Sequence, residues 1–517
     1  MPFQLSKAQL NSSLEQRCFA LLVVLHFLPV LSFRFFHTLD GPSHLYNASL
    51  IKHLLLGNDA ISRYFTINPI PVPNWIGHGM LGASNLILPA FLSEKLLLAI
   101  YFFGMPYAFR ALVKAIDGTS WSYYLIFPFL YSFPLFLGFY NFCISLVILM
   151  ATLAYWFLNE RAFPEKKSST ILFLLFLLLY FSHPTSFIIA LSVVLVRLLI
   201  LLNRWKTLAF TAVIAFPLLL LCLYFFQFPK TSGLSYISKP ILIRWLEDIR
   251  PLIAYSNVEE RYTRKIFYVL AAVTGVGLWY EFISIRFSRK GLKQYLLSSK
   301  VFWAGLVSFL ILAYFLLPDS SNVAGFISVR TGLLCFLFLL VFISLLRTPA
   351  WLQVSTICLL IGLNALRLSL ILPSMQKMSR QGAEIEKASR LIPENATVLP
   401  LNYTGNWLME HASAYLGLHK PIIILNNYEA GTRYFPLKWN KNESFPQFLL
   451  GKSTVSSSCM FWESNKISKR QIPADYVFLF GSINNTNDTC LRSVLNEIQG
   501  GYQSIYSSGF CALYRLK

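Results

Sequence analysis

Long apolar runs alternate with short polar segments over the first 372 residues of the chain. Each run contains roughly 20 residues, which is enough for a helix to cross the hydrocarbon core of a membrane. Residues 76–92 are also apolar, but counting them as a span would place two basic loops outside, so we expect an interfacial helix there. We therefore expect eleven spans, at residues 18–36, 95–113, 122–137, 140–158, 170–184, 186–203, 207–226, 264–283, 301–317, 329–346 and 350–372.

Basic residues gather in five of the loops between these spans. Because positively charged loops stay in the cytoplasm, they fix the orientation of the chain. The clusters are Arg110 and Lys114; Arg161, Lys166 and Lys167; Arg204 and Lys206; Arg286, Arg289, Lys290, Lys293 and Lys300; and Arg347. We expect the N-terminus inside the cell and three large segments outside, at residues 37–94, 227–263 and 373–517. No cleavable signal precedes the first span, so it should remain as an anchor.

The last of these segments differs in character from the rest, because its pattern mixes short strands with helices. We expect strands at residues 398–403, 421–427, 475–481, 502–507 and 510–515, with helices near 407–417 and 489–499. The pattern indicates an α-helical polytopic membrane protein. Its transmembrane domain covers residues 1–372, including the external loops 37–94 and 227–263, and a small extracytoplasmic α/β domain covers 373–517.

The composition agrees with this fold class, since 56% of the 517 residues are hydrophobic and only 13% are charged. A net charge of +21 would suggest nucleic-acid binding in a soluble protein, but here the cytoplasmic loops account for much of it. Of eight cysteines, Cys459, Cys490 and Cys511 lie in the outer segment, where one disulfide fits the sequence but its pair is not determined. No Cys/His cluster has the spacing of a zinc site.

The first external segment begins with FFHTLDGPSHLYNASLI, residues 35–51. Asp40 follows the first span directly, and apolar residues then recur every three or four positions, which predicts a helix over 42–56 along the membrane interface. One interpretation is that Asp40 only caps this helix. The other is that the helix holds the Asp40 carboxylate above a cavity, beside His44 and Asn47.

These features together resemble the C-type (GT-C) glycosyltransferases: one span, a large external segment opening with an acidic residue, interfacial helices, many further spans and a C-terminal external domain. The family includes protein O-mannosyltransferases and aminoarabinose transferases, and some bacterial members begin with a similar Asp-Gly-Pro-x-His stretch. The resemblance implies transfer of a sugar from a polyprenyl-phosphate donor to a hydroxyl acceptor, with Asp40 as the catalytic base. Phosphate is already a good leaving group, so one carboxylate suffices, and attack from the opposite face inverts the anomeric carbon.

A leaving phosphate needs cations, and the guanidinium of arginine suits its geometry. Arg330 opens the tenth span after a Pro-Asp loop, where it either binds the phosphate or extends towards lipid headgroups. Lys239 and Arg244 in the 227–263 loop are alternative phosphate ligands, and both also fit solvated charges.

Polar residues near other outer turns are candidates for substrate binding. His183 lies between the fifth and sixth spans, where it either faces a cavity or belongs to a capped turn. Tyr140 and Asn141 occupy an outer turn where many related enzymes carry a second acidic residue. Because this chain has no acid there, its sequence supports no metal cofactor, and a divalent ion remains an unsupported option. His411 lies at a strand-to-helix junction, where it either binds sugar or packs structurally.

The leading hypothesis is an inverting glycosyltransferase of the bacterial inner membrane, part of cell-envelope synthesis. Its partners would be a polyprenyl-phosphate-linked sugar, a lipid, glycan or protein acceptor, and membrane lipids, but no nucleic acid. A polysaccharide polymerase or ligase that uses a lipid-diphosphate glycan is an alternative. A membrane transporter or export subunit is the non-enzymatic alternative, although transporters usually show inverted repeats and charges at mid-span. The sequence determines neither the sugar, the acceptor, the metal dependence nor the oligomeric state.

Overall fold

The computed structural model describes residues 13–226, 233–286, 298–321, 324–432, 434–440, 474–481 and 489–517. The chain forms two compact units. The first, which we call the helical unit, contains residues 1–29, 99–135 and 142–374. The second, the mixed unit, contains residues 30–98, 136–141 and 375–517. The predicted division has a single boundary at residue 372, whereas each of these units combines several segments of the chain. The predicted domains stay a prediction.

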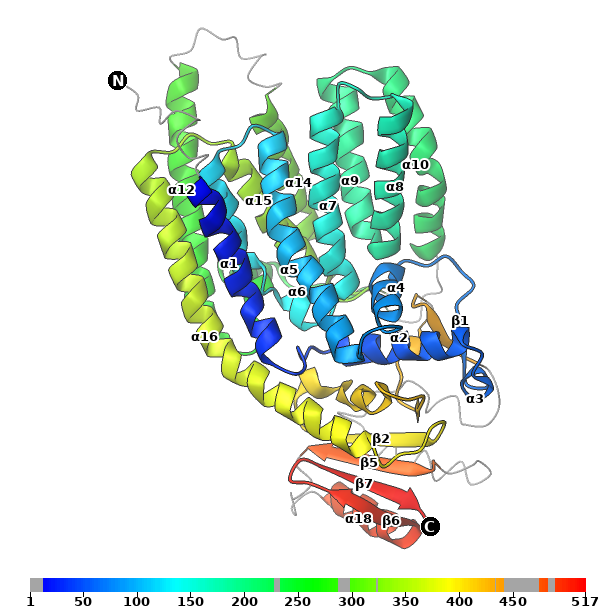
Figure 1. The fold of residues 1–517 in the computed structure, drawn as a ribbon. Helices are drawn as coiled ribbons and strands as arrows, with labels where there is room; N and C mark the ends of the chain where they lie inside the picture. The colour runs from blue at the N-terminus through cyan, green and yellow to red at the C-terminus, as the bar shows by residue number, and fades with distance from the viewer. Residues whose placement is uncertain are drawn as a thin grey trace. The chain divides into compact units, whose positions relative to one another are not determined.

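Long apolar helices make up most of the helical unit. Within the described ranges, nine helices are long and apolar enough to cross a membrane. In Figure 1, α8, α9 and α10 lie side by side, and Ser145 of α7 lies within hydrogen-bond distance of Ser186 of α9. The nine contain α1 (Ser13–Ser32), α5 (Ala90–Ala115), α7 (Tyr140–Asn159), α9 (Pro184–Val196) with the π-helical turn Arg197–Leu201, α10 (Trp205–Phe226), α12 (Glu260–Arg286), α14 (Ser299–Leu316), α15 (Ile327–Ser344) and α16 (Ala350–Ser389). A shorter helix, α8 (Lys166–Ser182), packs against α9 and α10.

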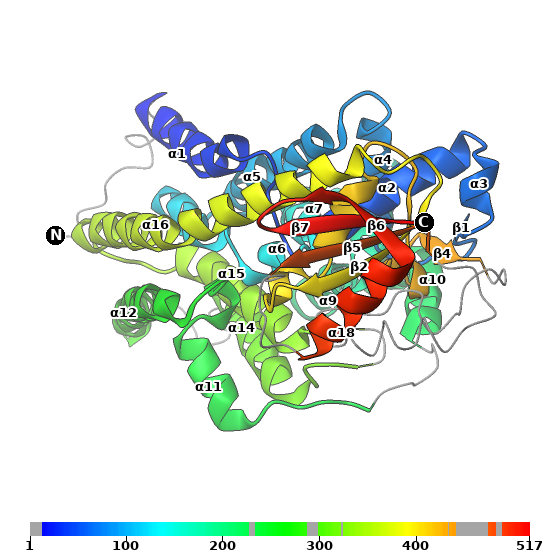
Figure 2. The same cartoon turned by 90° about the horizontal axis from the view of Figure 1, so that it is seen from below.

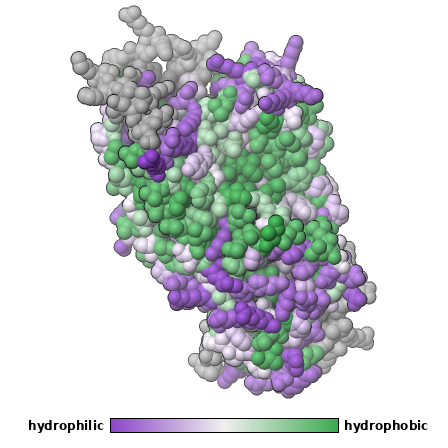
Figure 3. Space-filling model, in the orientation of Figure 1, coloured by the Kyte–Doolittle hydropathy of each residue, from purple (hydrophilic) through white to green (hydrophobic). Residues whose placement is uncertain are grey.

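Large apolar side chains cover the outer surface of several of these helices. On α10, for example, Val213, Phe216 and Leu223 are all more than half exposed. Figure 3 shows such hydrophobic residues gathered over the helices. A water-exposed surface would not tolerate an apolar area of this extent, whereas a lipid environment requires it. The chain is therefore an integral membrane protein of the predicted polytopic helical class.

One predicted span has a different form. Residues 122–137 contain a 3₁₀ helix, η1 (Ser120–Phe129), and a short helix, α6 (Phe133–Phe136), rather than one membrane-length α-helix. Pro128 and Pro134 account for this, because proline supplies no N–H and disrupts the helical ladder. The apolar stretch 76–92 is also interrupted: α4 (Trp75–Ser84) ends several residues before α5 begins, as expected for a short helix rather than a span.

The 227–263 loop contains α11 (Lys239–Glu247) and two 3₁₀ helices, η3 (Arg250–Leu252) and η4 (Asn257–Glu259). Its residues 227–232 lie outside the described ranges. The same holds for Cys459 and for most of the basic cluster between α12 and α14. Cys511 is a buried free thiol, and a pairing of Cys459 with Cys490 stays untested.

The mixed unit contains a five-stranded sheet with the order β3-β2-β5-β7-β6. The β2 strand is parallel to β3 and β5, whereas β7 is antiparallel to β5 and β6. Figure 2 shows the sheet with α18 beside β6. The bounds are β2 (Thr397–Tyr403), η5 (Trp407–Met409), η6 (Ala412–Gly417), β3 (Ile423–Ile424), η7 (Glu429–Gly431), β5 (Tyr476–Gly481), α18 (Thr489–Gly501), β6 (Tyr502–Ser507) and β7 (Cys511–Leu516). The predicted small α/β region is thus confirmed.

Residues 37–94, predicted to be the first external segment, belong to this unit and pack against the C-terminal region. They contain α2 (Gly41–Leu55), α3 (Asp59–Ser62), β1 (Phe65–Ile67) and α4. The β1 strand pairs antiparallel with β4 (Leu437–Trp439). On α2, the Tyr46 hydroxyl donates to the Ile422 carbonyl at 2.6 Å. Residues 41–51 are all buried, so the polar side chains of α2 contact protein rather than water.

In the helical unit, a fully buried arginine joins three chain segments. Arg367 on α16 is 0% exposed and donates to the backbone carbonyls of Pro128 and Tyr131, at 3.2 and 3.1 Å, and of Leu252. Its guanidinium also lies 3.7 Å from the Glu259 carboxylate. This side chain thus supplies donors to two carbonyls of the proline-containing segment that replaces a regular span.

We predict that Arg367→Lys destabilises the protein, because an ammonium group cannot reach several carbonyls in a fixed fork. Leaving two buried carbonyls without donors should cost about 2 kcal/mol or more. The apparent melting temperature of the purified protein in detergent measures this. Arg380→Lys is the matched control, since Arg380 lies on the same helix but is exposed. Equal melting temperatures for the two variants would contradict the prediction.

Candidate functional site

Asp40 occupies the N-cap position of α2, but within the described part of the chain its side chain makes no capping hydrogen bond. Its backbone is instead held by a neighbouring segment: the Asp40 N–H donates to the Leu137 carbonyl at 3.1 Å, and Leu39 donates to Phe136 at 3.0 Å. Gly138 follows with a φ of +76°, and a Cβ there would lie only 2.6 Å from the Gly41 nitrogen. The capping interpretation of Asp40 therefore lacks its hydrogen bond.

The Asp40 carboxylate lies in a nearly enclosed polar environment. The residue is 8% exposed, and its Oδ1 is 3.6 Å from Nε2 of His411. The His411 ring stacks on Tyr428 with 4.1 Å between ring centroids. Burial lowers the pKa of His411 to about 3, so this imidazole is neutral at neutral pH. Burial, with the Asp40 charge as the next cause, raises the pKa of Tyr428 well above its usual value.

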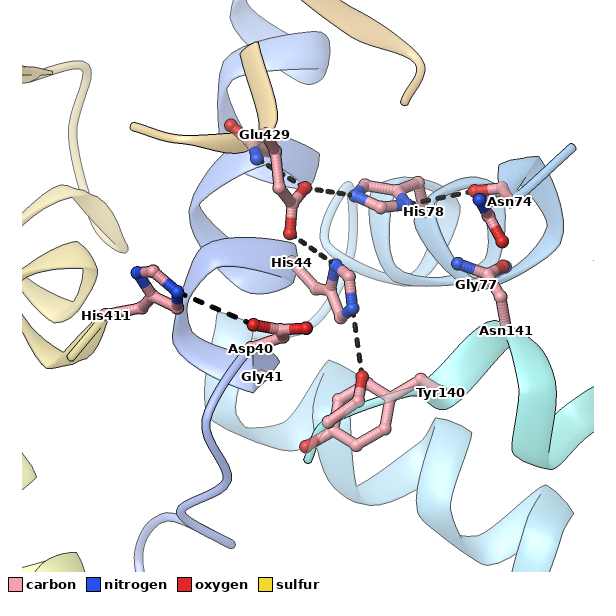
Figure 4. Close-up of polar contacts among 12 residues, drawn as sticks. Asp40, Gly41, His44, Asn74, Gly77, His78, Tyr140, Asn141, His411 and Glu429 are labelled. Atoms are coloured by element: carbon pink, nitrogen blue, oxygen red, sulfur yellow. Dashed lines mark hydrogen bonds and ion pairs between the residues drawn. The ribbon is translucent and has the colours of Figure 1, made fainter. Parts of the chain in front are cut away.

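One helical turn after Asp40, His44 belongs to a buried cluster around Glu429 (Figure 4). Nδ1 of His44 lies 2.7 Å from Oε1 of Glu429, and Nε2 of His78 lies 2.9 Å from Oε2. The Asn47 amide donates to the same Oε2 at 2.6 Å. None of these four residues is more than 3% exposed.

The charges of this cluster support one another. Burial alone would raise the pKa of the Glu429 carboxyl, but the nearby His44 and His78 hold it well below its usual range. Burial would likewise lower the pKa of His44, yet the charges of Glu429 and Asp40 raise it above its ordinary value. A carboxylate without water is stable only when paired, so the cluster keeps Glu429 ionised.

A second group of hydrogen-bonded polar side chains lies next to the start of α2. The Tyr140 hydroxyl donates to Oε1 of Glu94 at 2.7 Å and lies 3.3 Å from Oγ1 of Thr38. That Thr38 oxygen in turn accepts from the Gly41 N–H at 3.0 Å. The adjacent Asn141 accepts from the backbone N–H of Gly77 at 2.7 Å, which fixes the start of α4.

The helical unit holds the remaining candidates. Arg330 lies in the first turn of α15, with its Nη1 3.4 Å from Nε2 of His183 and its guanidinium 5.8 Å from the centre of the Phe142 ring. His183 separates α8 from α9 and is buried. Lys239 and Arg244 are exposed on α11.

Most of the predicted residues form two groups, and Lys239 and Arg244 on α11 belong to neither. Asp40, His44, Asn47, Tyr140, Asn141 and His411 come together in the mixed unit, and Arg330 and His183 come together in the helical unit. Three buried residues of the mixed unit were missed: His78, Glu94 and Glu429. His78 carried a weak indication, as a histidine inside an apolar stretch. Glu429 carried none, because it follows a strand in an irregular segment whose partners are more than 300 residues away.

Comparison with solved structures identifies the architecture. The chain superposes on ArnT from Cupriavidus metallidurans bound to undecaprenyl phosphate with a TM-score of 0.51, over 98% of each chain and at 10% sequence identity. The apo state of the same protein matches with a TM-score of 0.48 at 12% identity, over 97% of this chain and 98% of that chain. No protein-family model and no curated protein matches the sequence. ArnT is an aminoarabinose transferase of the GT-C class, so the predicted GT-C resemblance is confirmed for the fold.

We predict that Gly41→Ala disturbs the start of α2. A Cβ at this position would clash with Oγ1 of Thr38 and would lie 2.6 Å from the Tyr140 hydroxyl. Overpacking of this kind should cost about 1–3 kcal/mol. Gly79→Ala on α4 is the control, because nothing lies within 4 Å of a Cβ there. Comparing thermal unfolding of the two variants checks this, and a Gly41 variant as stable as the Gly79 variant would contradict it.

Proposed function

We propose that the protein is an integral-membrane glycosyltransferase that moves a sugar from a polyprenyl-phosphate donor to a hydroxyl acceptor, with Asp40 as the general base. The observation that carries the proposal is the Asp40 carboxylate: it is buried at the start of α2 and makes no capping bond there within the described residues. The fold of the whole chain supports the same reading, because it resembles that of ArnT, which was solved with undecaprenyl phosphate bound.

The reaction requires one proton transfer and one displacement. Asp40 takes the proton from the acceptor hydroxyl as its oxygen forms a bond to the anomeric carbon. The bond from that carbon to the phosphate oxygen breaks, and the electron pair leaves with the polyprenyl phosphate. Attack opposite the leaving group inverts the anomeric configuration. A positioned base of this kind contributes about 10²–10⁴-fold to the rate.

The surroundings of Asp40 favour the base role. Because His411 is neutral, it forms no strong ion pair with the Asp40 carboxylate, 3.6 Å away. Two backbone hydrogen bonds to residues 136 and 137 fix where the side chain starts. We assign Tyr140, Asn141, His44 and Asn47 to supporting positions around it, through the contacts described above.

The leaving phosphate needs cationic ligands, and Arg330 with His183 supplies a candidate pair. The guanidinium presents several donors in a plane, which suits phosphate oxygens. Lys239 and Arg244 on the exposed α11 are secondary candidates. We place the transfer on the extracytoplasmic side, because the basic loops of the sequence belong in the cytoplasm.

We predict that Asp40→Asn reduces transfer by at least about 100-fold, since it retains the shape and removes the basicity. The assay follows release of undecaprenyl phosphate from a panel of undecaprenyl-phosphate sugars, with a cell-envelope extract as acceptor. Undecaprenyl phosphate alone should still raise the melting temperature of the variant, because lipid binding does not need the base.

A capping role makes the opposite prediction. Asn caps a helix about as well as Asp, so Asp40→Asn would be silent and Asp40→Ala would be destabilising. Since the carboxylate makes no capping bond in the described structure, we expect Asp40→Asn to unfold at a temperature near that of the wild type. An active Asn variant would exclude Asp40 as the base.

We also predict that Arg330→Lys loses most of the transfer rate, because a lysine cannot reproduce the planar fork of donors. The matched control is Arg347→Lys, just beyond the other end of α15, where the side chain is 70% exposed. Both variants are compared in the assay above and by stabilisation with undecaprenyl phosphate. A fully active Arg330→Lys variant would assign Arg330 to lipid headgroups instead.

A further inference from the structure

Three residues of the mixed unit converge in a way that the proposed reaction does not use. His44 comes from α2, His78 from α4 and Glu429 from η7. One ligand atom from each lies within 4.8 Å of the other two, and all three residues are buried. The two imidazole rings are nearly perpendicular, at 82°, with 4.8 Å between their centroids. Two histidines and one carboxylate form a common ligand set for first-row metals.

The outward-facing nitrogens of both rings already have acceptors. Nε2 of His44 lies 3.0 Å from the Gly138 carbonyl, and Nδ1 of His78 lies 3.2 Å from the Asn74 carbonyl. Carbonyl oxygens only accept, so each of these nitrogens carries its ring proton. In a neutral imidazole the other nitrogen then presents a lone pair, and in both rings that nitrogen faces Glu429. Metal-binding histidines are oriented by the same kind of backbone contact.

Two lone pairs cannot face a carboxylate without a positive charge between them. Either both rings take up a proton, or one divalent ion replaces the two protons; the net charge is the same. One divalent ion would satisfy both Nδ1 of His44 and Oε1 of Glu429, which lie 2.7 Å apart without an aligned hydrogen bond to any described residue. Both atoms are buried, so no bulk water compensates them.

The dimensions also suit a metal ion. Tetrahedral zinc with ligands at about 2.0–2.1 Å separates them by about 3.3 Å. The two N···O distances of 2.7 and 2.9 Å would widen by about half an ångström around such an ion, and all three ligand atoms already lie within 4.8 Å of one another. Phe435 covers the cluster, with its ring centre 5.9 Å from that of His44 and 5.7 Å from that of His78. The Asn47 amide restrains the carboxylate.

We propose that His44, His78 and Glu429 bind a divalent first-row transition-metal ion, with Zn²⁺ as the representative ion. The ion joins α2, α4 and the C-terminal region, and so holds the helical turn that begins at Asp40. Its role is to stabilise this arrangement, since metal binding couples directly to folding. The proposal does not depend on the transfer reaction and is tested by binding alone.

The test uses the full-length protein in detergent, with any affinity tag removed and bound metal stripped by a chelator. Titration with Zn²⁺ by calorimetry, and with Co²⁺ by visible absorption, should give one ion per chain. His78→Gln and Glu429→Gln should each weaken Zn²⁺ binding at least about 100-fold, since each removes a ligand. His53→Gln is the matched control, because His53 lies on α2, is partly exposed and is outside the cluster.

Thermal unfolding supplies a second measurement. Zn²⁺ should raise the melting temperature of the wild type and of His53→Gln, but not that of a folded His78→Gln variant. If Glu429→Gln does not fold, the Zn²⁺ affinity and melting temperature of His78→Gln alone test the proposal. A wild-type protein that binds no stoichiometric Zn²⁺, or a His78→Gln variant that binds it as tightly as the wild type, would overturn the proposal.

Discussion

A carboxylate removed from water must be paired, and in this protein that requirement falls on Glu429. Its two oxygens lie against His44 and Asn47 of α2 and His78 of α4. An unpaired buried charge would cost several kcal/mol. Moving α2 or α4 away from Glu429 would incur this cost, so the three segments stay together. The antiparallel pairing of β1 with β4 adds a second connection between the same regions. The position of α2, and with it that of Asp40, depends on this pairing.

Much of the fold follows from local patterns in the sequence. Apolar runs identify most of the long helices, and alternating short segments identify β2, β5, β6 and β7 closely. The exception at residues 122–137 is instructive. Hydropathy measures only the cost of leaving water, so it cannot distinguish a regular helix from a proline-containing segment whose carbonyls bond to Arg367.

The candidate site could likewise be predicted from the sequence only in part. Asp40 and His44 could be identified because they share one conspicuous motif, and residues 138–142 because they form an outer turn. The sequence could not indicate that these two motifs meet through the backbone of residues 39–40 and 136–137, since nothing local encodes that pairing. Glu429 is the clearest case, because its identity as a buried acid arises only from side chains distant in sequence. When a site is formed by residues from distant segments, no single segment contains a sequence pattern that identifies it.

The separation between Asn47 and Glu429, 382 residues, also bears on how the chain is made. Ribosomes add about 5–20 residues per second, so α2 exists for roughly 20–80 s before its partner carboxylate is synthesised. During that time the histidines of α2 and α4 have no Glu429, and β1 has no β4. The mixed unit therefore cannot be completed while the chain is still being inserted through its later helices. Its assembly follows the synthesis of residue 429, and a chain that stops before that residue lacks the carboxylate against which His44, His78 and Asn47 lie.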